Sequence, residues 1–267
     1  MNMKRMTTAL IGFPLVACVL ILGNKYVIDV VFAIAAMFAL YEYNNALKIK
    51  AKPIQWIGYL ACASMAFIHI IPKEYLVTII GMMIPITVLV LFLHVIISNM
   101  KINIVDIALT LFGMCYIVLF MLFMPLLMGK ENGKLLVWYV IFSAWGTDVF
   151  AYFIGKKFGK HKFSAVSPKK SIEGCIGGIF GAVLLCGLYT LFLNTQHNMN
   201  INYFIICAIA AVLSVVGQIG DFSASTIKRY VDIKDYSNLF PGHGGMLDRI
   251  DSVIFIAPFA YFLLMLI

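Results

Sequence analysis

Two acidic residues near the C-terminal end of the chain, Asp248 and Asp251, stand where an apolar stretch begins. At a spacing of three they lie on one face of a helix. Carboxylates on a helix that enters lipid are costly unless a cation lies between them, and Mg²⁺ prefers carboxylate and phosphate oxygens. The pair therefore predicts a divalent-cation site that holds a phosphorylated substrate.

A second set of polar residues precedes this pair. If the apolar helix before it continues past the membrane, Asp221, Ser225 and Lys228 fall at i, i+4 and i+7, which is one face. The carboxylate suits a cation, while the hydroxyl and the ammonium can donate to phosphoryl oxygens. Arg229 and Arg249 can each bind a phosphate through the two arms of the guanidinium.

A glycine-rich turn, His243-Gly244-Gly245, lies directly before the last apolar stretch. Glycine lets a ligand approach backbone N–H groups closely, and a helix N-terminus favours anions. Such a turn by itself is more often only a turn. Its place between two sets of phosphate-binding side chains is what makes it a candidate for substrate binding.

The other long polar segment covers residues 156–173 and carries six lysines, among them Lys160, Lys169 and Lys170. They can bind anionic lipid headgroups at about 1 kcal/mol each, or they can gather a polyphosphate. Asp148 lies just before them, inside an apolar stretch, and a carboxylate in such a position is a functional candidate by default.

The elements that must position these residues are membrane helices. The chain has 267 residues, of which 63% are hydrophobic and 12% charged, with a mean hydropathy of +0.97. A soluble domain has about 45–50% apolar and about 25% charged residues. Nine stretches approach the length of about 20 residues that crosses a bilayer. They cover residues 7–23, 26–43, 54–72, 75–97, 103–127, 135–155, 173–193, 202–222 and 251–267. We expect an all-α transmembrane bundle that forms one domain over residues 1–267.

The orientation follows from the positive charges. With a cytoplasmic N-terminus, and with residues 7–23 as an uncleaved first span, 16 of the 20 Lys and Arg residues lie on the cytoplasmic side. The net charge of +8 is thus a topology signal, and no nucleic-acid partner is expected. We interpret Asp29 and Asp106 as boundary charges, and expect Glu42 to pair with Lys48 or Lys50.

The segment from Ser225 to Asp251 resembles the signature of the phosphatidate cytidylyltransferases, also called CDP-diacylglycerol synthases. The matching residues are Ser225, Lys228, Arg229, Lys234, Asp235, His243, Gly244, Gly245, Asp248, Arg249 and Asp251. The resemblance covers about a tenth of the chain, and residues 148–162 and 167–174 also resemble the family.

The resemblance implies that CTP and phosphatidate react to CDP-diacylglycerol and pyrophosphate, for phospholipid biosynthesis. It implies Mg²⁺ held by Asp221, Asp248 and Asp251, and it allows a monovalent cation such as K⁺ beside it. Lys228, Arg229 and Arg249 would join these aspartates in catalysis. The expected substrate-binding residues are Asp148, Lys160, Lys169, Lys170, Ser225, Lys234, His243, Gly244 and Gly245. A homodimer in the cell membrane, with its site facing the cytoplasm, is also implied.

Two other classes of protein stay open from the residues. A CTP-dependent polyprenol kinase would share the membrane and the nucleotide but would transfer the γ-phosphate. A transporter would use Asp148 and the late aspartates as an ion site, although such proteins often have internal repeats, and no clear repeat is present here.

Overall fold

The computed structural model describes residues 14, 16–99, 101–164, 167–168, 170–240, 242 and 244–267. Regular structure in these residues is helical, with two isolated β-bridges, Lys162 to Ser171 and Phe240 to Gly244. The chain divides into two compact units, residues 1–129 with 231–249 and residues 130–230 with 250–267. The single domain over residues 1–267 stays a prediction, because this division concerns packing within the chain only.

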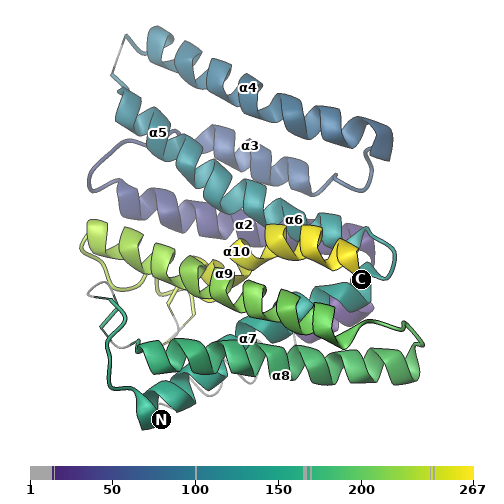
Figure 1. Cartoon of the computed structure of the whole chain (residues 1–267). Coiled ribbons are helices and arrows are strands. Elements are labelled where there is room, and N and C mark those ends of the chain that lie inside the picture. Colours follow the sequence, from purple (N-terminus) through teal and green to yellow (C-terminus); the bar gives the residue numbers. More distant parts are fainter. Residues whose placement is uncertain are drawn as a thin grey trace. The chain divides into compact units, whose positions relative to one another are not determined.

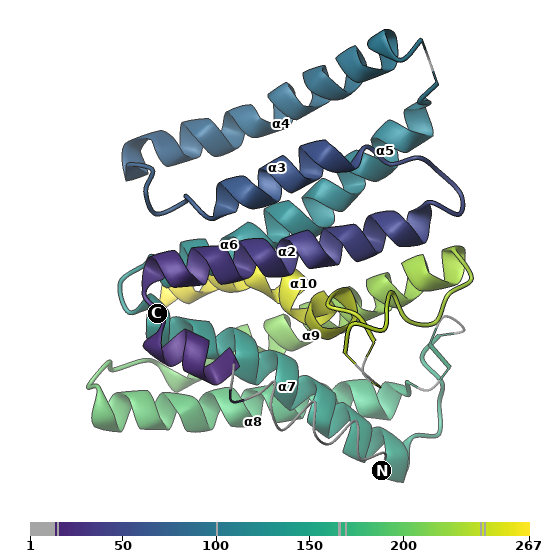
Figure 2. The same ribbon diagram turned by 180° about the vertical axis from the view of Figure 1, so that it is seen from behind.

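The first unit contains the helices of the N-terminal half. These are α2 (Lys25–Leu47), α3 (Gln55–Met65), α4 (Lys73–Ile97), α5 (Ile104–Gly113), the π-helix η1 (Met114–Leu119) and α6 (Phe120–Met128). Figure 2 shows α2 lying beside α3, and α2 also contacts α6. Helices α5, η1 and α6 follow each other without a break, so that the expected span 103–127 is one helix with a π-helical turn inside it.

Polar side chains fix the helix ends of the first unit. Asn103 accepts a hydrogen bond from the Asp106 backbone N–H, and Asp106 accepts one from the Asn103 backbone N–H, which is a reciprocal cap of α5. Asp106 also accepts a hydrogen bond from the Lys52 backbone N–H at 2.6 Å. Asp29 binds His69 Nδ1 at 2.7 Å. Both aspartates lie near the starts of their helices, as expected of boundary charges, but they are buried, with Asp106 2% exposed and Asp29 0%.

The second unit contains α7 (Gly133–Phe158), α8 (Ile172–Gln196), α9 (Tyr203–Tyr230), most of α10 (Leu247–Leu263) and the 3₁₀ turn η2 (Leu264–Leu266). Figure 1 shows α8 running alongside α7. Their backbones meet at glycines, since a Cβ on Gly146 would lie 2.8 Å from the Gly181 carbonyl oxygen. Small residues at helix crossings are typical of membrane bundles, where close packing replaces the hydrophobic driving force.

Seven helices of the described residues are long and apolar enough to cross a membrane. They are Lys25–Leu47, Glu74–Ile97, Ile104–Met128, Gly133–Phe158, Ile172–Gln196, Tyr203–Tyr230 and Leu247–Leu266. They match seven of the nine expected spans and indicate a multi-pass membrane protein. Residues 7–13 and 15 of the expected span 7–23 lie outside the described residues. The expected span 54–72 is shorter than predicted, because α3 ends at Met65 and its backbone continues in turns with i to i−3 hydrogen bonds.

Candidate active site

An ion pair between Lys170 and Asp221 forms the centre of a charged cluster in the second unit. Lys170 comes from the segment between α7 and α8, and Asp221 from α9. Their side chains are 30% and 26% exposed. Asp148 of α7, Asp251 of α10 and Lys228 of α9 lie close enough for their charges to act on Lys170. We call these five residues the Lys170 cluster.

Burial governs the charge of Lys170. It lowers the pKa of the ammonium from its ordinary value of 10.5, because desolvation penalises the charged form. The carboxylates of Asp148 and Asp251 act in the opposite direction and favour the charged form. A partly buried ammonium among carboxylates is a group that can exchange its partner for an incoming anion.

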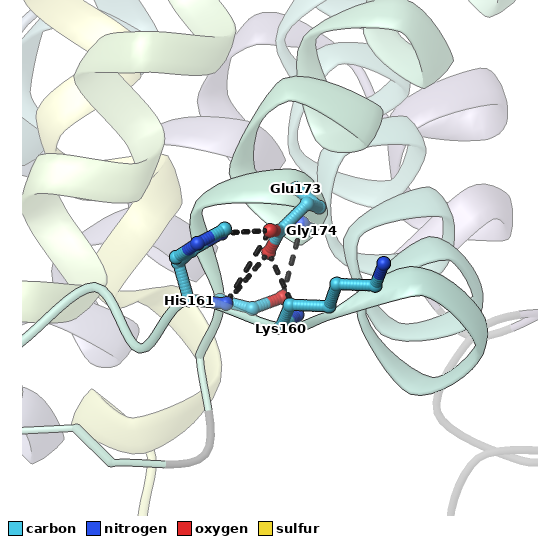
Figure 3. A network of polar contacts seen from close by, with 5 residues as sticks. Lys160, His161, Glu173 and Gly174 are labelled. Carbon is cyan, nitrogen blue, oxygen red and sulfur yellow. Dashed lines mark hydrogen bonds and ion pairs between the residues drawn. The ribbon is translucent and has the colours of Figure 1, made fainter.

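The segment that carries Lys170 is tied to the first turn of α8. Glu173 accepts hydrogen bonds from the backbone N–H groups of Lys160 and His161, and its carboxylate lies 2.6 Å from His161 Nδ1 (Figure 3). The backbone N–H of Phe163 donates to the Lys170 carbonyl oxygen at 3.0 Å. These contacts close the segment into a loop and fix the backbone of Lys170. Lys160 is exposed at its rim, and Lys169 lies outside the described residues.

The packing of α9 against α10 brings Asp221 and Asp251 into this cluster. A Cβ on Gly220 would lie 2.6 Å from the Asp251 carbonyl oxygen, so the two helices approach closely next to Asp221. As predicted, α9 continues beyond its apolar part, to Tyr230. Ser225 and Lys228 are half-buried, and Arg229 is exposed. Periodicity therefore predicted the helix that carries Asp221. Only the packing of four segments identified Lys170 as the partner of Asp221.

An apolar groove of about 460 Å³ borders the Lys170 cluster. Side chains of α8 and α9, such as Ile176, Ile179 and Ile219, line it. Phe222 forms one end, where its ring stacks on Phe163 at 4.6 Å between centroids and lies 4.6 Å from Lys170 Nζ. An ammonium at the end of an apolar groove suits a ligand with an anionic head and an apolar tail.

The glycine-rich turn and the start of α10 belong to the first unit. One carboxylate oxygen of Asp248 accepts hydrogen bonds from the backbone N–H groups of Tyr236 and Gly245, both at 2.9 Å. Gly244 has φ +82°, and a Cβ there would lie 2.7 Å from that oxygen. Glycine at position 244 is thus favoured by its backbone conformation and by the nearby Asp248 carboxylate, besides the predicted approach of a phosphate.

The other predicted residues of this segment are peripheral or not described. Lys234, Asp235 and Arg249 are exposed. His243 lies outside the described residues.

No group of three His, Cys, Asp or Glu side chains is arranged to hold a metal ion within the part of the chain that the structure describes. The donor chemistry nevertheless fits Mg²⁺, because Asp221 and Asp251 supply hard oxygen ligands. They lie beside the Lys170 ammonium, so their negative charges attract a cation at this point, against the cost of burial.

Sequence reasoning misplaced one residue of this region. Glu42 of α2 was expected to pair with Lys48 or Lys50, but Lys48 Nζ donates to Asn45 at 2.9 Å. Glu42 instead accepts hydrogen bonds from Ser237 Oγ and from the backbone N–H groups that lead into α10. The expectation was wrong because the partners are about 200 residues away in the chain. The available signal was an acidic residue inside an apolar span, which is a functional candidate.

Comparisons with known proteins show the family of the chain. A model of the cytidylyltransferase family matches residues 3–267. Over 167 residues, 62% of this chain, it is 39% identical to the phosphatidate cytidylyltransferase of Bacillus subtilis. The proteins of that name from Thermotoga maritima and Staphylococcus aureus are 42% identical over 135 residues (50% of this chain) and 35% identical over 173 (64%). The matched parts cover 59%, 48% and 64% of these relatives, which is less than two thirds of each. The chain belongs to the cytidylyltransferase family.

Proposed function

We propose that this protein transfers the cytidylyl group of CTP to phosphatidate, giving CDP-diacylglycerol and pyrophosphate. The observation that carries this proposal is the Lys170 cluster beside an apolar groove, because phosphatidate combines a phosphate head with apolar chains. The names of the matched relatives, phosphatidate cytidylyltransferase, support the same substrates.

The reaction requires no covalent protein intermediate. The phosphate of phosphatidate is largely a dianion near pH 7, since the second pKa of a phosphomonoester is about 6. One of its oxygens would attack the α-phosphorus of CTP, the bond from that phosphorus to the bridging oxygen would break, and pyrophosphate would leave. The protein then contributes positioning and charge stabilisation.

The side chains divide these tasks. Lys170 exchanges Asp221 for a phosphate oxygen, while Lys228, Arg229 and Arg249 neutralise charge that develops on the leaving group. Lys160, Lys169 and Lys234 attract the nucleotide, and Ser225, His243, Gly244 and Gly245 bind its phosphates. Asp148 holds the cationic side chains in place.

Mg²⁺ would be held by Asp221, Asp248 and Asp251, and when bound it would neutralise the triphosphate. A monovalent cation such as K⁺ is proposed as an auxiliary ligand of the same region. We further propose about nine spans, a cytoplasmic N-terminus and a homodimer in the cell membrane, with the site at the cytoplasmic face. The balance of Lys and Arg between the two sides supports this orientation.

Labelled CTP tests the function. The purified full-length chain in detergent is incubated with phosphatidate, Mg²⁺ and CTP labelled at the α- or the γ-phosphate. We expect α-label in a CDP-lipid and γ-label in pyrophosphate. Transfer of γ-label to a lipid would instead support the polyprenol kinase. Without any transfer, and with no thermal stabilisation by CTP and Mg²⁺, the transporter would be favoured.

A further inference from the structure

We propose that Glu42 is a positioning residue that holds the turn before α10, described at residues 236–240, 242 and 244–247, and thereby places Asp248. This inference rests on the proposed function, since it concerns the same cation and nucleotide site. All the contacts that carry it lie within the first unit.

Glu42 forms a buried bridge between α2 and the turn. Glu42 is 2% exposed. One carboxylate oxygen accepts hydrogen bonds from Ser237 Oγ at 2.6 Å and from the Met246 backbone N–H at 2.9 Å, and the other from the Leu247 backbone N–H at 2.8 Å. The three donors come from both ends of the turn, so a single carboxylate fixes its entry and its exit.

Two of these hydrogen bonds come from backbone N–H groups at the start of α10. The first N–H groups of a helix have no partner within the helix, and α10 begins at Leu247. Glu42 supplies that partner from another helix, and its negative charge also suits the positive end of the helix dipole. Asp248 is the next residue, and its own carboxylate is bound to Tyr236 and Gly245 of the same turn.

The glycine that precedes Met246 shows how closely Glu42 is fitted to this backbone. A Cβ on Gly245 would lie 2.3 Å and 2.4 Å from the two Glu42 carboxylate oxygens. A side chain at this position would push the carboxylate away from its donors. Gly245 is therefore needed by Glu42, and not only by a ligand.

The chain offers a matched control in Asp106. It is also 2% exposed, and each of its oxygens also accepts a backbone N–H, from Lys52 at 2.6 Å and from Asn103 at 2.9 Å. It belongs to the same unit but caps α5, which carries none of the proposed site residues. Asp106→Asn therefore reproduces the loss of a buried acceptor without touching the turn.

The experiment compares Glu42→Gln and Asp106→Asn in the full-length protein in detergent. The amide keeps the shape of the carboxylate but turns an NH₂ group toward one of the two backbone N–H groups. We expect both variants to lower the unfolding temperature. Only Glu42→Gln should raise the Mg²⁺ concentration for half-maximal activity, by at least fivefold, and speed hydrogen exchange of residues 244–249 by at least tenfold in the free protein.

The exchange measurement keeps the two proposals separable. If the wild type transfers no cytidylyl group, the proposed function fails, whereas exchange of residues 244–249 still tests the role of Glu42. Equal exchange and equal Mg²⁺ dependence in the two variants would show that Glu42 contributes only to stability. If Glu42→Gln does not fold, Ser237→Ala removes one of the three bonds, and a Mg²⁺ requirement unchanged from wild type there would overturn the proposal.

Discussion

Replacing Lys170 by methionine removes the positive charge at the centre of the Lys170 cluster while keeping a long, unbranched side chain. Asp221 then loses its ion-pair partner, and Lys228 is the remaining cation of the cluster beside three carboxylates. An exposed ion pair contributes at most about 1 kcal/mol, whereas removing one partner of a buried pair costs about 3–5 kcal/mol. With the two side chains 30% and 26% exposed, we expect a loss of about 2 kcal/mol.

The complementary change, Asp221→Asn, should cost less. The ammonium of Lys170 keeps Asp148 and Asp251 as neighbours, so we expect a loss of about 1 kcal/mol. In the double variant no charge is left without its partner in the pair. Its loss should be smaller than the sum of the two single losses by about 1 kcal/mol.

Thermal unfolding in detergent without divalent cations measures these differences. A change of 1 kcal/mol shifts the midpoint by about 2–4 °C in proteins of roughly this size. Lys156→Met, at an exposed lysine of α7, is the control and should stay within about 0.5 kcal/mol of the wild type. Single effects that add to within about 0.5 kcal/mol would refute the compensation of Asp221 by Lys170.

Adding Mg²⁺ extends the same experiment. If the carboxylates form a cation site, the Lys170 ammonium competes with Mg²⁺ for them. A ligand present at 100 times its Kd stabilises by about 2.7 kcal/mol, so the midpoint of Lys170→Met should rise more with Mg²⁺ than that of the wild type. An equal rise in both proteins would contradict the assignment of these carboxylates to the cation.

Three further changes test other parts of the structure. Asp248→Asn should lower kcat/KM in the labelled-CTP assay at least about 100-fold while expression stays normal, and near-normal turnover would contradict the metal assignment. Ile176→Trp, on α8, should fill the apolar groove and raise KM for long-chain but not for short-chain phosphatidate. The control Ile205→Trp, on α9 away from the groove, should change neither KM. Equal effects of Ile176→Trp on both chain lengths would argue against an acyl chain in the groove. Gly146→Ala should destabilise by about 1–3 kcal/mol because the Cβ meets the backbone of α8, while Gly187→Ala, with open space around its Cβ, should not; equal midpoints would refute close packing there.

Local patterns were sufficient for the helices. The apolar stretches predicted all seven membrane-length helices of the described residues. The reason is that a backbone in lipid must satisfy its own hydrogen bonds, and a helix does so within one segment. The extension of α9 was the hypothesis under which Asp221, Ser225 and Lys228 share one face, and α9 does continue to Tyr230. The early end of α3 did not follow, because hydropathy measures transfer to lipid and is insensitive to a change from α-helical to turn hydrogen bonding.

The late polar segment with Asp248 and Asp251 was identified from the sequence alone, because charged residues in so apolar a chain are few and their spacing on a helix is fixed. The sequence also identified Lys170 and Asp221 as separate candidates. Only the tertiary structure decided that Lys170 pairs with Asp221, and that Glu42 binds the turn before α10 instead of a neighbouring lysine. Periodicity places side chains on a face of their own helix, whereas partners from distant segments depend on how the helices pack, and that packing is set by contacts such as Gly220 against Asp251.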